Sequence, residues 1–187
     1  MAFNSMGFLL FTVLAVVGYY LIPGRFQWMW LLVFSYLYYA SHGAGLLGYL
    51  LFSTVTTYVA GRCLERKKKK KYQKAVVIIT LTLNFGMLGT LKYLNFIILN
   101  VNRIVRGHLS YLELVLPIGI SFYTFQSTGY LIDVYREKFE PERNPAKFAL
   151  FVSFFPQIIQ GPISFYDQLA HQLYAEHKFE YKNLKHG

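Results

Sequence analysis

Apolar residues gather in six windows along the chain, separated by short stretches that carry most of the charge. The windows extend over residues 8–22, 28–40, 45–60, 76–99, 115–135 and 148–165. Several approach the ~20 residues that a helix needs to cross a bilayer, although the second and third are short. The pattern predicts an all-α, polytopic membrane protein with about five to six apolar helices.

The fifth window carries polar side chains where hydrocarbon would exclude them. Helical spacing places Tyr123, Gln126, Tyr130 and Asp133 near one stripe. Such groups are tolerated in a membrane only where they face a protein interior or a wet cavity. Two interpretations stay open. The stripe either bonds neighbouring helices or lines a substrate path, with Asp133 beside Arg136 at the cytoplasmic end.

The sixth window combines prolines with glutamines. Pro156 and Pro162 remove backbone donors, and Gln157 and Gln160 lie one helical turn apart. Irregular backbone at membrane depth is tolerated only where protein or water covers it. We therefore expect a broken or re-entrant element over residues 148–165, with Pro156, Gln157 and Gln160 lining a cavity.

Lys92 is a further charge within an apolar stretch, because it interrupts residues 81–101 and is followed by Tyr93 and Asn95. A long lysine side chain can extend to the membrane surface, and this is the simpler interpretation. An inward-facing role in the membrane is the alternative.

Composition and charge agree with a membrane protein of defined orientation. Hydrophobic residues make up 55% of the chain and charged residues 15%, against roughly 25% charged in soluble domains. Much of the net charge of +10 lies between the third and fourth windows, in residues 62–74. Short basic loops stay cytoplasmic, so we expect the amino terminus and the 41–43 loop outside. A nucleic-acid partner is not expected, because topology explains these basic residues.

The motifs of soluble enzymes are absent from the sequence. A single cysteine, Cys63, excludes an intrachain disulfide and a multi-cysteine metal site, and no metal is expected. No Gly-rich phosphate loop or Gly-x-Ser-x-Gly motif is present. The histidines lie in loops or in the polar tail, where a solvated surface role is expected: His42, His108, His171, His177 and His186.

Several blocks of the chain together resemble a known family. The main blocks are residues 116–126 (LPIGISFYTFQ), 130–136 (YLIDVYR), 152–157 (VSFFPQ) and 161–163 (GPI). Further matches are residues 3–5, 35–40 and 91–96. These blocks resemble the membrane-bound O-acyltransferases, in the branch of the alginate O-acetyltransferase membrane subunit.

The resemblance implies a ring of helices around a funnel, and transfer of an acetyl or other acyl group to hydroxyls of an extracellular or envelope polysaccharide. The donor would be a thioester, acetyl-CoA or an acyl carrier, with no cofactor permanently bound. Asp133 and Arg136 would lie at the cytoplasmic mouth where the donor arrives. An extracytoplasmic acyltransferase partner and a bacterial cytoplasmic membrane are also implied.

The family's catalytic histidine lies in a Trp-His-Gly block after the Gly-Pro region, and this chain has no such block. In His186–Gly187 the preceding residue is Lys185, and the position follows Pro162 too closely. We expect residues 1–187 to be the amino-terminal part of one acyltransferase domain, inactive alone and without a catalytic residue of its own. A channel or transporter fragment and a noncatalytic membrane scaffold remain as alternatives.

The basic loop gives a first prediction about topology. A cysteine at position 42 (His42→Cys) should react with an impermeant thiol reagent in intact cells, and one at position 69 (Lys69→Cys) should not. Labelling at position 69 from outside would overturn the orientation.

Overall fold

A computed structural model describes residues 6–65, 69–105, 110–112, 115–160 and 164–177, without the side chains of Ala44, Glu65, Val105, Ile159 and Gln160. Over these ranges the secondary structure is helical, which confirms the predicted all-α class. The chain divides into two compact units. The first combines Met1–Gly48 with Glu142–Gly187, and the second is Tyr49–Pro141.

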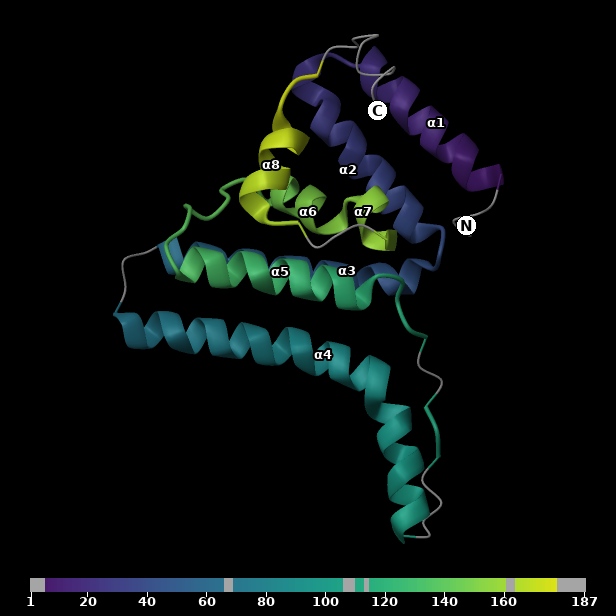
Figure 1. Ribbon diagram of the computed structural model, residues 1–187, viewed down its shortest axis with the longest axis vertical. Helices are drawn as coiled ribbons and strands as arrows, with labels where there is room; N and C mark the ends of the chain where they lie inside the picture. Colours follow the sequence, from purple (N-terminus) through teal and green to yellow (C-terminus); the bar gives the residue numbers. More distant parts are fainter. Residues whose placement is uncertain (1–5, 66–68, 106–109, 113–114, 161–163, 178–187) are drawn as a thin grey trace. The chain divides into compact units, whose positions relative to one another are not determined.

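The first unit is built around α2 (Gly24–Ala40), against which four other helices pack (Figure 1). These are α1 (Met6–Leu21), α6 (Pro145–Ser153), α7 (Phe155–Gln160) and α8 (Tyr166–Tyr174), and the short 3-10 helix η1 (Ala44–Leu46) follows α2. Aromatic rings fill the centre between α1, α2 and α7: Phe8, Phe11, Phe34, Tyr38 and Phe155. Ring centroids 5.5–5.8 Å apart place these rings in the range of favourable aromatic pairs.

A close approach between α1 and α2 depends on the absence of a side chain at Gly18. A Cβ built there would lie 2.2 Å from Cζ2 of Trp30. The Trp30 ring cannot easily move, because its Nε1 donates to the carbonyl of Ala15 at 2.9 Å and the ring stacks on Phe34. Gly18 therefore sets how closely the two helices pack.

Gln27 connects α2 to the segment that follows α8. Its Nε2 donates to the carbonyl of His177 at 2.8 Å, and its Oε1 accepts from the His177 N–H at 2.9 Å. The same Nε2 also contacts the carbonyl of Tyr19 at 3.2 Å. The side chain is buried, so these bonds replace the water that it would otherwise bind. Gln27 thus holds the segment at His177, which lies 150 positions later in the sequence.

The second unit consists of α3 (Leu47–Glu65), α4 (Lys70–Val105) and α5 (Ile120–Tyr135). The first part of α4 runs antiparallel to α3 and α5, and α4 then bends away from them (Figure 1). Gly119 precedes α5 with a positive φ of 71°, a conformation that side chains with a Cβ disfavour. The glycine of the 116–126 block therefore turns the chain into α5.

The six predicted windows each contain helix, and one further helix lies outside them. The break expected in 148–165 is present, since α6 ends at Ser153 and α7 begins at Phe155. The sequence analysis missed α8, whose buried residues Tyr166, Ala170 and Leu173 follow a helical period in an otherwise polar segment. Among the described residues, α4 is the one helix long and apolar enough to cross a membrane, judged by length and composition.

The contact between Gly18 and Trp30 gives a second prediction. Gly18→Ala should displace the indole and break its bond to Ala15, which costs about 1–3 kcal/mol of folding free energy for an overpacked site. A lower midpoint of thermal unfolding and a red-shifted tryptophan emission would show this. Gly129→Ala, in α5 with nothing within 4 Å of the new Cβ, is the matched control. Equal midpoints for both variants would contradict the assignment.

Candidate functional site

The polar stripe predicted on α5 is buried. Tyr123 is 0% exposed, Gln126 2%, Tyr130 2% and Asp133 8%. Three further polar side chains of α5 are buried as well, at Thr124, Ser127 and Thr128. The Thr128 hydroxyl donates to the carbonyl of Thr124 at 2.8 Å, so the helix itself satisfies it. Together with the stripe, these residues place polar groups over more than half of the circumference of α5.

Polar side chains from all three helices of this unit meet at one point. The Ser53 hydroxyl of α3 donates to Asn84 Oδ1 of α4 at 2.6 Å and lies 3.5 Å from the Ser127 hydroxyl of α5. The Asn84 Nδ2 donates to Thr80 O at 2.9 Å and contacts the Thr56 hydroxyl at 3.3 Å. Ser53, Asn84 and Ser127 are completely buried. We call Ser53, Asn84 and Ser127 the three-helix cluster.

Two buried hydroxyls of the same unit have no hydrogen-bond partner among the described residues. They are Thr57 Oγ1 of α3 and Thr124 Oγ1 of α5, both on fully buried side chains. A buried hydroxyl without a partner costs about 1–3 kcal/mol, and a helix can usually satisfy a threonine through its own backbone. The described part of the structure therefore leaves these two hydroxyls without the hydrogen bond that burial calls for.

The carboxyl end of α5 carries an ion pair that the sequence analysis did not predict. Asp133 Oδ1 pairs with Lys138 Nζ at 2.7 Å. Glu137 has a φ of 59°, and the N–H groups of Glu137 and Lys138 bond the carbonyls of Val134 and Asp133. This C-terminal turn brings the chain back over the helix end and places Lys138 against Asp133. Arg136 is exposed.

Two cavities adjoin this helix end within the same unit, and they share Gln73, Tyr135 and Glu137. One has a volume of about 450 Å³ and the other about 290 Å³. The larger is further lined by Leu64, Val134, Phe139, Glu140 and Pro141, and the smaller by Lys70 and Arg136. Arg136 therefore lines a cavity at this helix end, and its place at a cytoplasmic mouth stays a prediction.

In the other unit, the break between α6 and α7 is fixed by specific bonds. Asn144 caps α6 by accepting from the N–H of Ala146 at 2.9 Å, and Pro145 follows at the first helical position. Phe154 leaves the helical conformation with a ψ of 106°, and the N–H of Phe155 donates to the Ser35 hydroxyl at 3.3 Å. The chain therefore restarts as α7 with its first N–H satisfied by α2.

The residues of 148–165 that were predicted to line a cavity lie in different surroundings. Pro156 is exposed on the first turn of α7 and lines an apolar cavity of about 240 Å³. That cavity is also bordered by Thr12, Ala15, Val16, Tyr19, Tyr20, Leu31, Phe154 and Phe155. Gln157 is buried and its Nε2 donates to the Ser164 hydroxyl. The side chain of Gln160, and residues 161–163 with Pro162, lie outside the described part.

Two tyrosines of α8 donate hydrogen bonds to groups at the start of α6. Tyr166 donates to Glu142 Oε2 at 2.6 Å, and Tyr174 donates to the carbonyl of Lys147 at 2.7 Å. Burial above all, with Tyr174 and Glu142 nearby, raises the pKa of the Tyr166 phenol above its ordinary value. The phenol therefore stays protonated and remains a donor to the carboxylate.

The remaining candidates lie apart from the buried polar groups. Lys92 is exposed, with its Nζ 5.6 Å from the centroid of the Tyr93 ring. The rings of His42 and His177 lie 3.0 and 2.9 Å from the carbonyls of Tyr38 and Gln172. His108 and His186 lie outside the described part. Within that part no three His, Cys, Asp or Glu side chains come together as metal ligands.

Sequence reasoning did not single out the three-helix cluster. Asn84 is a polar amide within the fourth window, and Ser53 begins a hydroxyl-rich stretch in the third, so both residues were visible in the sequence. Their meeting could not be inferred, because the partners lie 31 and 74 residues apart along the chain. The cluster has hydroxyl and amide groups but no acid or base. It can bind and orient a carbonyl or a hydroxyl, but it cannot take up a proton at neutral pH.

The chain is similar to known acetyltransferases. It is 30% identical over 212 residues to the peptidoglycan O-acetyltransferase of Helicobacter pylori, across 100% of this chain and 40% of that protein. It is 35% identical to the probable alginate O-acetylase AlgI of Azotobacter vinelandii and 33% identical to that of Pseudomonas aeruginosa. Those alignments cover 96% of this chain and 38% and 36% of the relatives. No family model and no solved structure matches.

These similarities confirm the resemblance seen in the signature blocks. The chain belongs to the membrane-bound O-acyltransferase family. The relatives are O-acetyltransferases by name, so the family is enzymatic. The chain spans about two fifths of the length of the curated relatives that it matches.

The three-helix cluster gives a third prediction. Asn84→Ala should leave the buried Ser53 hydroxyl without its acceptor and lower the free energy of unfolding by about 1–3 kcal/mol. Asn100→Ala in the same helix is the control, because Asn100 bonds the carbonyl of Phe96 one turn earlier. Thermal unfolding of both variants in the same lipid measures the difference. Equal loss at both positions would contradict a structural role for the cluster.

Proposed function

We propose that this chain forms part of a membrane O-acetyltransferase that moves an acetyl group from a thioester to a hydroxyl of an envelope polysaccharide. The names of the relatives support the reaction and the class of acceptor. The buried hydroxyl and amide groups of α3, α4 and α5 are the observation that carries the proposal at the level of residues. Polar groups inside apolar helices are expensive in free energy, so we expect them where they serve helix packing or bind a substrate.

In the proposed reaction the acceptor oxygen forms a bond to the acetyl carbon while the bond between that carbon and sulfur breaks. The acceptor proton passes to a base, and the thiol leaves. The residues of this chain would hold the reacting groups through hydrogen bonds in a site that excludes bulk water, where such bonds are strong. Thr57 and Thr124 are the best placed, because their hydroxyls are buried and without partners among the described residues. The base, a histidine by family resemblance, would come from outside residues 1–187.

The proposal includes a multi-pass arrangement with the amino terminus outside. Its support is the basic segment 62–74 between α3 and α4, and the apolar outer surface of α1. On α1 the exposed residues are Met6, Leu9, Leu10, Val13, Leu14, Val16, Val17, Tyr20 and Leu21. A helix with that surface needs lipid or further protein around it. In this arrangement α4 crosses the membrane together with further apolar helices of the chain.

The donor side of the proposal rests on the cavities at the carboxyl end of α5. Lys70 and Arg136 line the smaller cavity, where their charges would attract the phosphates of acetyl-CoA or of an acyl carrier. This end of the unit adjoins the segment expected in the cytoplasm, where such donors are made. The proposal also includes an extracytoplasmic acyltransferase partner that completes polysaccharide acetylation.

The experiment compares residues 1–187 with the gene extended by its downstream sequence. Both are expressed, together with the neighbouring envelope acyltransferase partners, in a host that lacks polysaccharide O-acetylation. Ester acetate on the envelope polysaccharide is then measured. The extended gene should restore acetate and residues 1–187 alone should not, because loss of a general base alone costs about 10²- to 10⁴-fold.

Two results would count against this account. Acetate restored by residues 1–187 would mean that this chain carries a base, and would direct attention to His171, His177 and His186. No acetate from the extended gene, with the protein present in the membrane, would contradict the acetyltransferase function itself.

A further inference from the structure

The last part of α4 extends beyond the length that one membrane crossing requires. The helix has 36 residues, which at ~1.5 Å per residue gives a length of about 54 Å. The hydrocarbon core of a bilayer is only ~30 Å thick. The helix also bends beyond its midpoint (Figure 1). A single crossing therefore does not account for the residues near its carboxyl end.

These residues carry an apolar stripe that nothing in the described chain covers. Tyr93, Ile97, Val101 and Ile104 follow one another at steps of four, four and three, so they lie on one side of the helix. Their exposed fractions are 49%, 52%, 37% and 82%. The same side of the helix therefore presents apolar surface over three turns.

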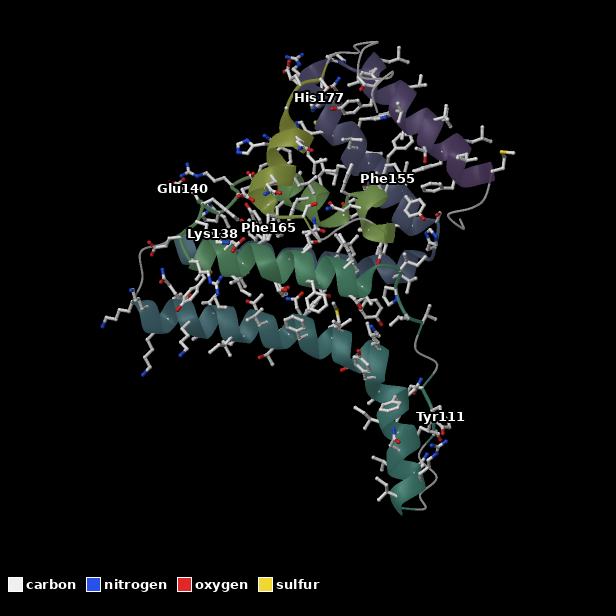
Figure 2. All side chains as sticks on the ribbon, viewed as in Figure 1. Tyr111, Lys138, Glu140, Phe155, Phe165 and His177 are labelled. Carbon is white, nitrogen blue, oxygen red and sulfur yellow. The ribbon has the colours of Figure 1, made fainter. Side chains whose placement is uncertain are left out.

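The opposite side of the helix is occupied by the chain itself. Asn95 donates through Nδ2 to the carbonyl of Leu112 at 2.8 Å, and its Oδ1 accepts from the Leu112 N–H at 3.1 Å. Figure 2 shows Tyr111 beside this part of α4, on the segment that Asn95 holds. At ~100° per residue, Asn95 lies roughly opposite the centre of the apolar stripe. The returning segment therefore leaves the apolar stripe open.

Two basic residues accompany the apolar stripe. Lys92 and Arg103 are both exposed and are eleven positions apart, so they share one side of the helix. That side borders the stripe at Tyr93, whose ring lies 5.6 Å from Lys92 Nζ. This arrangement matches the depth profile of an anionic lipid surface. Apolar residues enter the acyl region, aromatic rings lie at the headgroup level, and basic residues contact the lipid phosphates.

We propose that residues 91–105 of α4 form an interfacial helix on an anionic phospholipid surface. The stripe Tyr93, Ile97, Val101 and Ile104 enters the acyl region, and Lys92 and Arg103 contact the lipid phosphates. The helix thus crosses the bilayer in its first part and lies along the surface in its last part. This inference does not depend on acetyl transfer, because it uses only the surface of α4.

The test uses spin labels on single cysteines at positions 97, 101 and 104 in the protein expressed from its own gene, with Cys63→Ser. The protein is reconstituted in vesicles of phosphatidylcholine with phosphatidylglycerol. Collisions with oxygen should be frequent and collisions with a water-soluble nickel complex rare. The three labels should lie at the same depth, since an interfacial helix is parallel to the surface. A label at Asn102, which at ~100° per residue lies on the side of the helix away from the stripe, should instead contact nickel.

Three outcomes would overturn the proposal. Frequent nickel collisions at all three positions would place the stripe in water, and rare collisions with both reagents would place it against protein. A depth that changes by about 10 Å from position 97 to 104 would mean that this part crosses the bilayer.

The anionic lipid is tested separately. The label at position 101 should become shallower in pure phosphatidylcholine, and the variant with Lys92→Gln and Arg103→Gln should lose this dependence on lipid charge. Both residues are exposed, so the variant should fold like the parent. An identical depth in both lipids would contradict the contact with phosphate.

Discussion

Hydrogen-bond satisfaction inside apolar helices is the constraint on which the second unit depends. Ser53, Asn84 and Ser127 come from three different helices, and each is completely buried. A buried polar group without a partner costs about 1–3 kcal/mol, so these side chains fix the helices where the bonds can form. A shift of one helix along another would separate Ser53 from Asn84, which are 2.6 Å apart. The cluster therefore sets the register of α3, α4 and α5.

The same constraint applies to the two buried hydroxyls that have no hydrogen-bond partner among the described residues. Thr57 and Thr124 lie on the same helices as the cluster, yet no described residue accepts or donates a hydrogen bond to their hydroxyls. A protein that satisfies most of its buried groups and leaves a few open provides fixed positions for a ligand. In the proposed acetyltransferase these positions would orient the acceptor or the thioester, while the proton goes to a base elsewhere.

The sequence predicted the helical class, the polar stripe of α5 and the break in 148–165, because each follows from local spacing or from proline chemistry. The break lies inside the predicted range but not at Pro156. Pro156 sits in the first turn of α7, where a missing N–H costs nothing, and the chain leaves the helix at Phe154 instead. The partner of Asp133 was missed because the positive φ of Glu137 redirects the chain, and an αL glutamate cannot be inferred from spacing. The three-helix cluster was missed because its members are far apart in the sequence.

The most direct test of the central claim replaces Thr124 by valine, which keeps the shape of the side chain and removes its buried hydroxyl. If the hydroxyl serves acetyl transfer, Thr124→Val in the extended protein should raise or preserve the midpoint of thermal unfolding and lower the rate of acetyl transfer at least about tenfold. Thr128→Val, which removes a hydroxyl already bonded to its own helix, should leave the rate nearly unchanged. A Thr124→Val variant with the parent's rate of transfer would contradict the claim that the open hydroxyls of this unit serve the reaction.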